Sequence, residues 1–193
     1  DYLMIMALFL VVAFLSSFLY LLTDVIYMDN NATTMVAPEV VQEMLPFFTE
    51  QCGNPSSMHQ FGNQVGRAIK QARKRVQALL GAEHDSEIIF TSCGTELDST
   101  AILSALKAQP DRKEIITTVV EHPAILSLCE YLKKDGYKVH YLKVDKRGRL
   151  NLQQYMDLLS DRVAIASVMW ANNESGTLFP VEDMAMLTRS AGV

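Results

Sequence analysis

The sequence predicts an α/β fold in which helices cover both faces of a mostly parallel sheet, preceded by an apolar segment expected to form a transmembrane helix. From residue 87 onward, β-branched runs alternate with amphipathic segments of helical spacing. That alternation is typical of parallel strands joined by crossover helices. The apolar segment covers residues 2–22 and carries no charge. About 20 apolar residues are enough to cross a bilayer.

The apolar segment differs chemically from the rest of the chain. Ser16 and Ser17 are its only strongly polar residues, and no Lys or Arg flanks it to set an orientation. It also lacks the basic start and the small-residue cleavage site of a signal peptide. We therefore divide the chain into a leader, residues 1–24, and a domain, residues 25–193. An upstream sequence wrongly joined to the domain is the alternative explanation of the leader.

The first part of the domain is expected to contain one strand and two helices. A short strand is predicted over 25–29, and the polar segment 30–34 is expected to turn the chain. Pro38 stands where a helix can begin, and apolar residues recur at helical spacing as far as Phe48. A loop rich in Gly, Asn, Pro and Ser follows at 52–57, and then a second amphipathic helix over 65–80.

The remainder alternates regularly between strands and helices. Pro123 begins one of these helices and Asn151 caps another. The predicted strands cover 87–91, 114–120, 138–144 and 163–170, and the predicted helices cover 101–108, 123–136, 151–160 and 181–191.

Composition excludes several classes of function. The chain has 193 residues and a net charge of −5, without the basic stripe that nucleic-acid binding requires. Its three cysteines and four histidines are scattered and show no metal-ligand spacing. We therefore expect neither a metal site nor a disulfide framework, and the isolated cysteines fit a reducing compartment.

Polar clusters follow three of the predicted strands. They are "SCGTE" at 92–96, "EHP" at 121–123 and "NNESG" at 172–176. Ligands of parallel α/β sheets bind at the carboxyl ends of the strands. Three clusters at such ends predict a binding site more strongly than any one of them.

The first cluster has two explanations. Gly94 permits close approach to the backbone and Thr95 adds a hydroxyl, so the start of this helix could bind a phosphate through free N–H groups. An ordinary N-cap by Ser or Thr explains the same residues and is preferred on the residues alone. Cys93 could be a nucleophile, but no base is assignable beside it, and we favour a small residue in a tight space.

The other two clusters also leave alternatives open. His122 could stack on an aromatic ligand or move a proton, and an ordinary hydrogen-bonded loop histidine is equally compatible with its position. Asn172 could direct its amide to a ligand oxygen, whereas turn formation is the common use of Asn.

Five ordered motifs together resemble a known family. "YMDNNATT", "GNPSSMHQFG", "FTSCGTELDSTA", "TTVVEHPAIL" and "VMWANNESGTLFP" resemble the NifS/IscS cysteine desulfurases, class V members of the fold-type I pyridoxal 5'-phosphate enzymes. The wording is nearest the NifS branch. The resemblance runs from about residue 25 to residue 193 and implies the amino-terminal part of a fold-type I large domain.

The resemblance implies a role for individual residues. Gly94 and Thr95 match the motif that binds the cofactor phosphate. His122 matches the histidine that stacks on the cofactor ring and takes part in acid–base steps. Asn172 matches the asparagine near the cofactor's 3-oxygen and the substrate carboxylate. Asn31, Ala32 and Thr33 match the amino-terminal part of the substrate pocket.

The resemblance also implies a reaction and partners for the parent enzyme. The reaction converts L-cysteine to L-alanine and leaves an enzyme-bound persulfide for iron–sulfur or nitrogenase cluster assembly. The implied partners are an iron–sulfur scaffold protein and a second subunit in a homodimer. The implied location is cytoplasmic, with a membrane contact only through residues 2–22.

The family's further catalytic residues have no match in these 193 residues. No lysine stands in the Ser-x-His-Lys context of the Schiff-base lysine, and none of the three cysteines lies in the sulfur-accepting loop. We therefore expect an amino-terminal fragment that is inactive alone. Leu97 also departs from the family, which usually has Ser there. A selenocysteine lyase, another class V enzyme, or a membrane-tethered inactive binding module are the alternatives.

Overall fold

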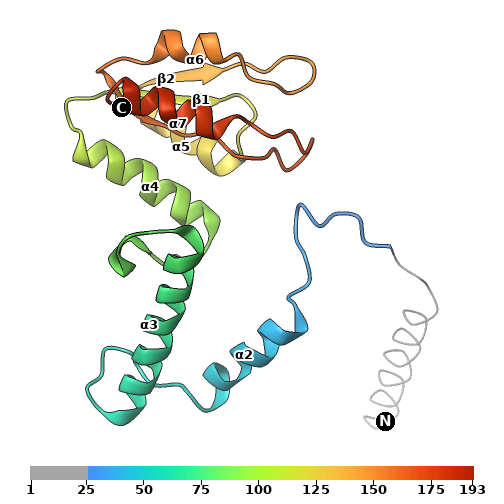
Figure 1. The fold of residues 1–193 in the computed structure, drawn as a ribbon, viewed down its shortest axis with the longest axis vertical. Helices are drawn as coiled ribbons and strands as arrows, with labels where there is room; N and C mark the ends of the chain where they lie inside the picture. The colour runs from blue at the N-terminus through green and yellow to red at the C-terminus, as the bar shows by residue number, and fades with distance from the viewer. Residues whose placement is uncertain (1–25) are drawn as a thin grey trace, which may run out of the picture. The chain divides into compact units, whose positions relative to one another are not determined.

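A parallel three-stranded sheet forms the centre of the domain. The computed structural model describes residues 26–193. The strands are β1 (Glu114–Thr118), β2 (Lys138–Leu142) and β3 (Val163–Ala166), in the order β2-β1-β3 (Figure 1). Both pairings of β1 are parallel, and a shift of register interrupts the β1–β3 pairing between Glu114 and Ile115. The α/β class and the parallel sheet therefore fit the expectation.

Helices pack on both faces of this sheet. Consecutive residues of a strand point to opposite faces, and Ile115 and Ile116 accordingly belong to different apolar clusters. The first cluster joins β1 and β3 to helices α4 (Gly94–Ala108) and α5 (Pro123–Lys134). The second joins all three strands to α6 (Leu152–Leu158) and α7 (Val181–Ser190). The buried members of the first are Ile102, Leu106, Ile115, Ile125, Cys129, Leu132 and Ala164, and those of the second are Ile116, Leu142, Tyr155, Val163 and Met184.

Local signals explain where several helices begin and end. Pro123 occupies the first turn of its helix, and the Asn151 side chain accepts two amide hydrogen bonds at the start of the next. Gly81 closes the longest described helix with a φ of 69°. The helices are α2 (Pro38–Thr49), α3 (Gln60–Leu80), α4 (Gly94–Ala108), α5 (Pro123–Lys134), α6 (Leu152–Leu158) and α7 (Val181–Ser190), with a 3-10 turn η1 (Asp85–Glu87) before α4.

Two predicted strands do not form in the described part of the chain. Within residues 26–193, the segments 26–29 and 88–91 have no strand partner. A β-rich sequence becomes a strand only when another strand pairs with its backbone. The second segment is instead held by Arg73, whose guanidinium donates to the Ile88 carbonyl and lies 5.0 Å from the centre of the Phe90 ring.

The predicted fold class needs one correction, which concerns the expected transmembrane helix. Residues 2–22, on which that expectation rests, lie outside the described residues. Among residues 26–193, no helix is long and apolar enough to cross a membrane. The fold class is therefore corrected to an α/β domain with a parallel sheet.

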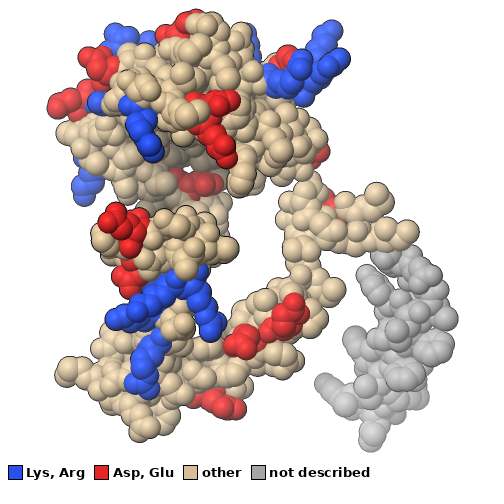
Figure 2. All heavy atoms as spheres, viewed as in Figure 1, with Lys and Arg blue, Asp and Glu red and all other residues tan. Residues whose placement is uncertain are grey.

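The described chain falls into two units. Residues 26–36 belong to the first unit, and Ala37–Val193 forms the second, which contains the sheet and its helices. In the second unit, Lys and Arg side chains gather over α3 (Figure 2). Five basic residues belong to this helix. Four are exposed, as expected for a solvated face: Arg67, Lys70, Lys74 and Arg75. The fifth, Arg73, is half-buried against residues 88–90.

A buried carboxylate fixes the amino-terminal edge of the sheet. Glu114 is 7% exposed. Its carboxylate lies 2.6 Å from His140 Nε2 and 2.9 Å from Arg162 Nε, with Lys138 Nζ at 3.6 Å. The hydrogen bond from His140, together with the charges of Arg162 and Lys138, lowers the pKa of Glu114 below its ordinary value. The carboxylate therefore stabilises the fold in its charged form.

We expect Glu114→Gln to lower the free energy of unfolding at pH 7 by about 1–2 kcal/mol, because it removes the charge that three basic side chains share. A folded-state pKa below the unfolded value means that the stabilisation is present above the unfolded pKa and is lost as pH falls through the folded pKa. Urea unfolding should show the two proteins converging below about pH 4. A gap that persisted at low pH would contradict this account.

Candidate functional site

Helix α4 begins with free backbone N–H groups. Its N-cap, Cys93, is extended, with φ −163° and ψ 171°, and no side chain makes a capping hydrogen bond there. The first intrahelical bond runs from Leu97 N–H to the Cys93 carbonyl, at 3.1 Å. A Cβ added at Gly94 would meet nothing within 4 Å. The space at the Gly94 Cβ position is therefore open, and the positive end of the helix dipole favours an anion there.

The Glu96 side chain folds back onto the residue before this N-cap. Ser92, a candidate N-cap in the sequence, donates its hydroxyl to Glu96 at 2.5 Å and its amide to the same carboxylate at 2.8 Å. These bonds lower the pKa of Glu96. The ordinary N-cap preferred from the residues alone is therefore absent.

Cys93 is exposed at the same turn. The Glu96 amide, followed by the Ser92 hydroxyl, lowers the pKa of the Cys93 thiol. No histidine or lysine is paired with its sulfur among the described contacts, so Cys93 still lacks a base. Cys129, in contrast, is buried in the core, and burial raises its pKa to about 11.

His122 lies between β1 and α5 and caps that helix. Its Nδ1 accepts the Ala124 amide at 3.1 Å, and the ring is exposed. A nitrogen that accepts an N–H bond carries no proton, so the ring proton of the neutral histidine lies on Nε2. His122 is thus a hydrogen-bonded loop histidine, as considered from the sequence, and its Nε2 remains free.

Asn172 lies in the loop after β3 and uses its side chain to shape that loop. Its Oδ1 accepts the amides of Glu174 and Ser175 at 3.1 and 2.9 Å. Its Nδ2 donates to the Val120 carbonyl at 3.2 Å. The turn role is therefore realised in this structure, and the same amide ties the loop to the segment before His122.

Glu121 is a residue of this edge that the sequence analysis did not single out. It is 7% exposed, and its Oε1 accepts the Met169 amide at 2.8 Å and the Thr118 hydroxyl at 3.1 Å. The sequence signal for it was an acidic residue directly after the strand predicted over 114–120. Glu121 and Asn172 together place the loops of His122 and Asn172 side by side.

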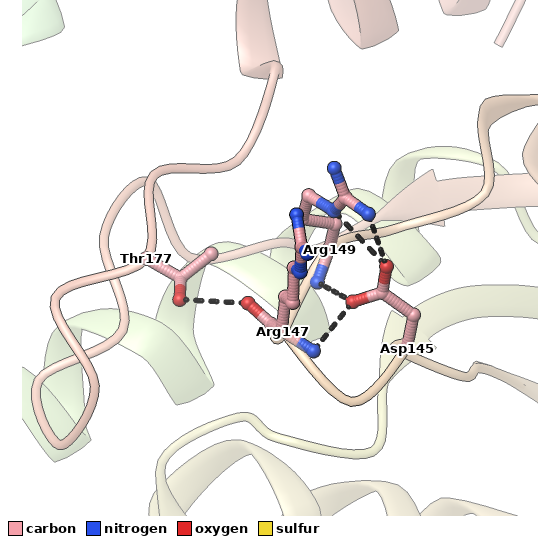
Figure 3. Close-up of polar contacts among 4 residues, drawn as sticks. All are labelled: Asp145, Arg147, Arg149 and Thr177. Atoms are coloured by element: carbon pink, nitrogen blue, oxygen red, sulfur yellow. Dashed lines mark hydrogen bonds and ion pairs between the residues drawn. The ribbon is translucent and has the colours of Figure 1, made fainter.

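A neighbouring turn supports the Asn172 loop (Figure 3). Asp145 accepts the amides of Arg147 and Arg149 at 2.8 and 2.9 Å and the Arg149 guanidinium at 2.9 and 3.0 Å. Thr177 donates to the Arg147 carbonyl at 3.5 Å and accepts the Ser175 hydroxyl at 3.0 Å. The turn over 145–149 therefore braces the loop that carries Asn172.

We expect Gly148→Ala to destabilise this brace. Gly148 has φ +75°, and an added Cβ would lie 2.9 Å from Thr177 Oγ1. The left-handed backbone and the clash together should lower the free energy of unfolding by about 2 kcal/mol. Gly136→Ala is the matched control, because Gly136 has φ +88° with open space around its Cβ position. Urea unfolding that showed equal losses for both variants would contradict a specific contact with Thr177.

The predicted substrate residues lie in the other unit. Asn31 and Ala32 form a turn in which the Ala32 amide donates to the Asp29 carbonyl at 3.1 Å. The Thr33 amide bonds the same carbonyl at 3.3 Å, and the Thr33 carbonyl accepts the Tyr27 hydroxyl at 3.0 Å. Their part in a substrate pocket remains a prediction. Within residues 26–193, no group of His, Cys, Asp and Glu side chains is arranged to hold a metal ion.

An α/β domain with a parallel sheet binds its ligand at the carboxyl edge of that sheet. This domain has the features of such a site, which are polar loops after β1 and β3 and an uncapped helix start. Comparison with protein families matches residues 26–193 to the family described as aminotransferase class-V. The chain therefore belongs to the aminotransferase class-V family.

Individual relatives indicate which kind of enzyme within the family the chain resembles. The chain is 72% identical over 168 residues to cysteine desulfurase NifS of Azotobacter vinelandii. The aligned region covers 87% of this chain and 42% of that protein. A solved structure titled as a NifS-like protein matches with a TM-score of 0.82 at 39% identity, over 86% of this chain and 46% of the other. Another, titled SspA in complex with cysteine, matches with a TM-score of 0.79 at 31% identity, over 86% and 48%. The chain thus spans less than half the length of the relatives it matches.

The residues of this edge fit the cofactor of the family. Members of the family are pyridoxal 5'-phosphate enzymes. A phosphate dianion suits the uncapped start of α4 with its open space at Gly94. The exposed imidazole of His122, on the loop after β1, suits the face of an electron-poor ring.

Proposed function

We propose that this chain is the cofactor-binding part of a cysteine desulfurase. The whole protein would remove sulfur from L-cysteine and form L-alanine. The observation that carries the proposal is the 72% identity to cysteine desulfurase NifS. The relative titled as a complex with cysteine supports the substrate.

The start of α4 would bind the cofactor phosphate. Gly94 and Thr95 contribute the first amides of the helix, and Thr95 adds an exposed hydroxyl. The N–H groups and the helix dipole favour a dianion at this position. When bound, pyridoxal 5'-phosphate supplies the electron sink that the cleavage chemistry needs.

His122 would orient the cofactor ring and handle a proton. Its Nδ1 is occupied by the Ala124 amide, at 3.1 Å. Only Nε2 is therefore available to donate or accept a proton toward the substrate side. The cap also limits rotation of the imidazole.

Asn172 would act as part of a shaped loop. Its Oδ1 accepts the amides of Glu174 and Ser175. A contact of this side chain with the cofactor's 3-oxygen would therefore be made by Nδ2. Asn31, Ala32 and Thr33 remain proposed substrate-pocket residues. A homodimer, an iron–sulfur scaffold protein as sulfur acceptor and a cytoplasmic location are further parts of the proposal, and the three free cysteines fit a reducing compartment.

We predict that the 193-residue chain binds pyridoxal 5'-phosphate but does not turn over L-cysteine. None of its lysines stands in a Ser-x-His-Lys context, and covalent cofactor chemistry needs that amine. The measurement is sulfide and alanine release with added cofactor, in parallel with selenocysteine as substrate. NifS of Azotobacter vinelandii serves as the active control. Turnover of either substrate by this chain would contradict the prediction, and failure to bind the cofactor would contradict the proposed function.

A further inference from the structure

The Glu121 carboxylate is buried at the candidate site without a role in binding or proton transfer. It is 7% exposed. Burial raises the pKa of Glu121, and the Met169 amide and Thr118 hydroxyl oppose that rise. Burial of a carboxylate is unfavourable unless donors satisfy it. Its place next to His122 therefore calls for an explanation in the contacts that it makes.

Those contacts join two segments that are far apart in the sequence. Glu121 Oε1 accepts the Thr118 hydroxyl, at the end of β1, and the Met169 amide, in the segment after β3. Asn172 Nδ2 adds a bond between the same segments through the Val120 carbonyl, at 3.2 Å. The two segments are thus linked at two consecutive residues, Val120 and Glu121, immediately before His122.

We propose that Glu121 is a positioning residue that holds the His122 segment and the Asn172 segment together as one unit. This inference rests on the proposed function, because it assigns both side chains to one cofactor. Without this link, the loop after β3 could shift relative to the turn before α5. The imidazole and the amide would then no longer meet a bound ring with fixed geometry.

The contacts indicate that Glu121 acts as a hydrogen-bond acceptor and not through its charge. Both hydrogen bonds end on one oxygen, Oε1. Glutamine retains such an oxygen at the same distance from the backbone, whereas alanine removes it. Glu121→Gln should therefore preserve the arrangement, and Glu121→Ala should lose it.

The test needs two substitutions in the full chain and a readout that requires no ligand. In Glu121→Ala, amide hydrogen exchange at Met169 should become about tenfold faster, because its hydrogen-bond acceptor is lost. The NMR signals of the His122 ring and the Asn172 side-chain amide should shift with it. Glu121→Gln should retain wild-type exchange and signals. Glu130→Ala is the matched control, since Glu130 is an exposed glutamate of α5 that bonds Lys133 and Tyr141.

Cofactor binding separates this inference from the proposed function. Titration with pyridoxal 5'-phosphate should show affinity about tenfold weaker for Glu121→Ala and within twofold of wild type for Glu121→Gln. Equal affinity and unchanged His122 signals in the alanine variant would overturn the inference while the function stood. A wild-type chain that failed to bind would overturn the function, and the exchange data would still decide the link. If the alanine variant did not fold, a disturbed Glu121→Gln variant would contradict the acceptor role and an undisturbed one would support it.

Discussion

Replacement of Gly94 by Asp is expected to weaken pyridoxal 5'-phosphate binding by about a hundredfold, or about 2.7 kcal/mol. The new carboxylate would stand at the start of α4, where the phosphate is proposed to bind, and would repel it. The fold should not suffer, because a Cβ at Gly94 meets nothing within 4 Å. An acidic residue in the first turn of a helix is also favourable to the helix dipole. Spectroscopic titration of the cofactor gives the affinity, and thermal melting checks the fold.

Two control variants make this result specific. Gly94→Ala adds a side chain without charge and should keep affinity within a few fold. Gln71→Glu adds one negative charge on the exposed surface of α3, and it should leave affinity unchanged if long-range charge is screened. An equal loss in Gln71→Glu would mean that net charge, and not the start of α4, decides binding.

Leu132→Ala should cause the largest loss of stability, about 3 kcal/mol. Leu132 is 2% exposed in the cluster that packs α4 and α5 on β1 and β3. The substitution removes buried methyl groups and leaves a cavity between these elements. Since α4 and α5 carry Gly94 and His122 at their starts, cofactor affinity should fall with stability. Urea unfolding provides the measurement.

Leu79→Ala is the matched control for this loss. Leu79 is 83% exposed at the end of α3, so its removal should change the free energy of unfolding by less than about 0.5 kcal/mol. Similar losses in both variants would contradict the assignment of the apolar core to α4, α5 and the sheet.

The sequence predicted elements best where a local signal marks their ends. Pro123 and Asn151 mark the starts of α5 and α6, and the structure begins both helices beside them. The strand over 163–170 was predicted too long, because β3 ends at Ala166. Residues 88–91 form no strand among the described residues. Strand pairing depends on partners distant in the sequence, which composition and periodicity do not specify.

The candidate site residues, like the helices and strands, were predicted best where a local feature of the sequence marks them. Position after a predicted strand was enough to single out Gly94, His122 and Asn172 as candidates. It did not reveal that Ser92 donates to Glu96 and leaves α4 uncapped, because the choice between accepting a helix amide and donating to a carboxylate depends on three-dimensional geometry. Glu121 belongs to the cluster after the strand predicted over 114–120, but it was not selected because the burial of its carboxylate depends on contacts with residues distant in the sequence. Its partner Met169 lies in a different loop.

The central claim is that the start of α4 binds the phosphate of pyridoxal 5'-phosphate. Amide chemical-shift mapping of the full chain tests it most directly, with pyridoxal, which lacks the phosphate, as the comparison ligand. The account predicts that the largest shifts with pyridoxal 5'-phosphate fall on the Gly94 and Thr95 amides and that pyridoxal leaves these two unmoved. Shifts that fell elsewhere, or that both ligands produced equally at α4, would contradict it.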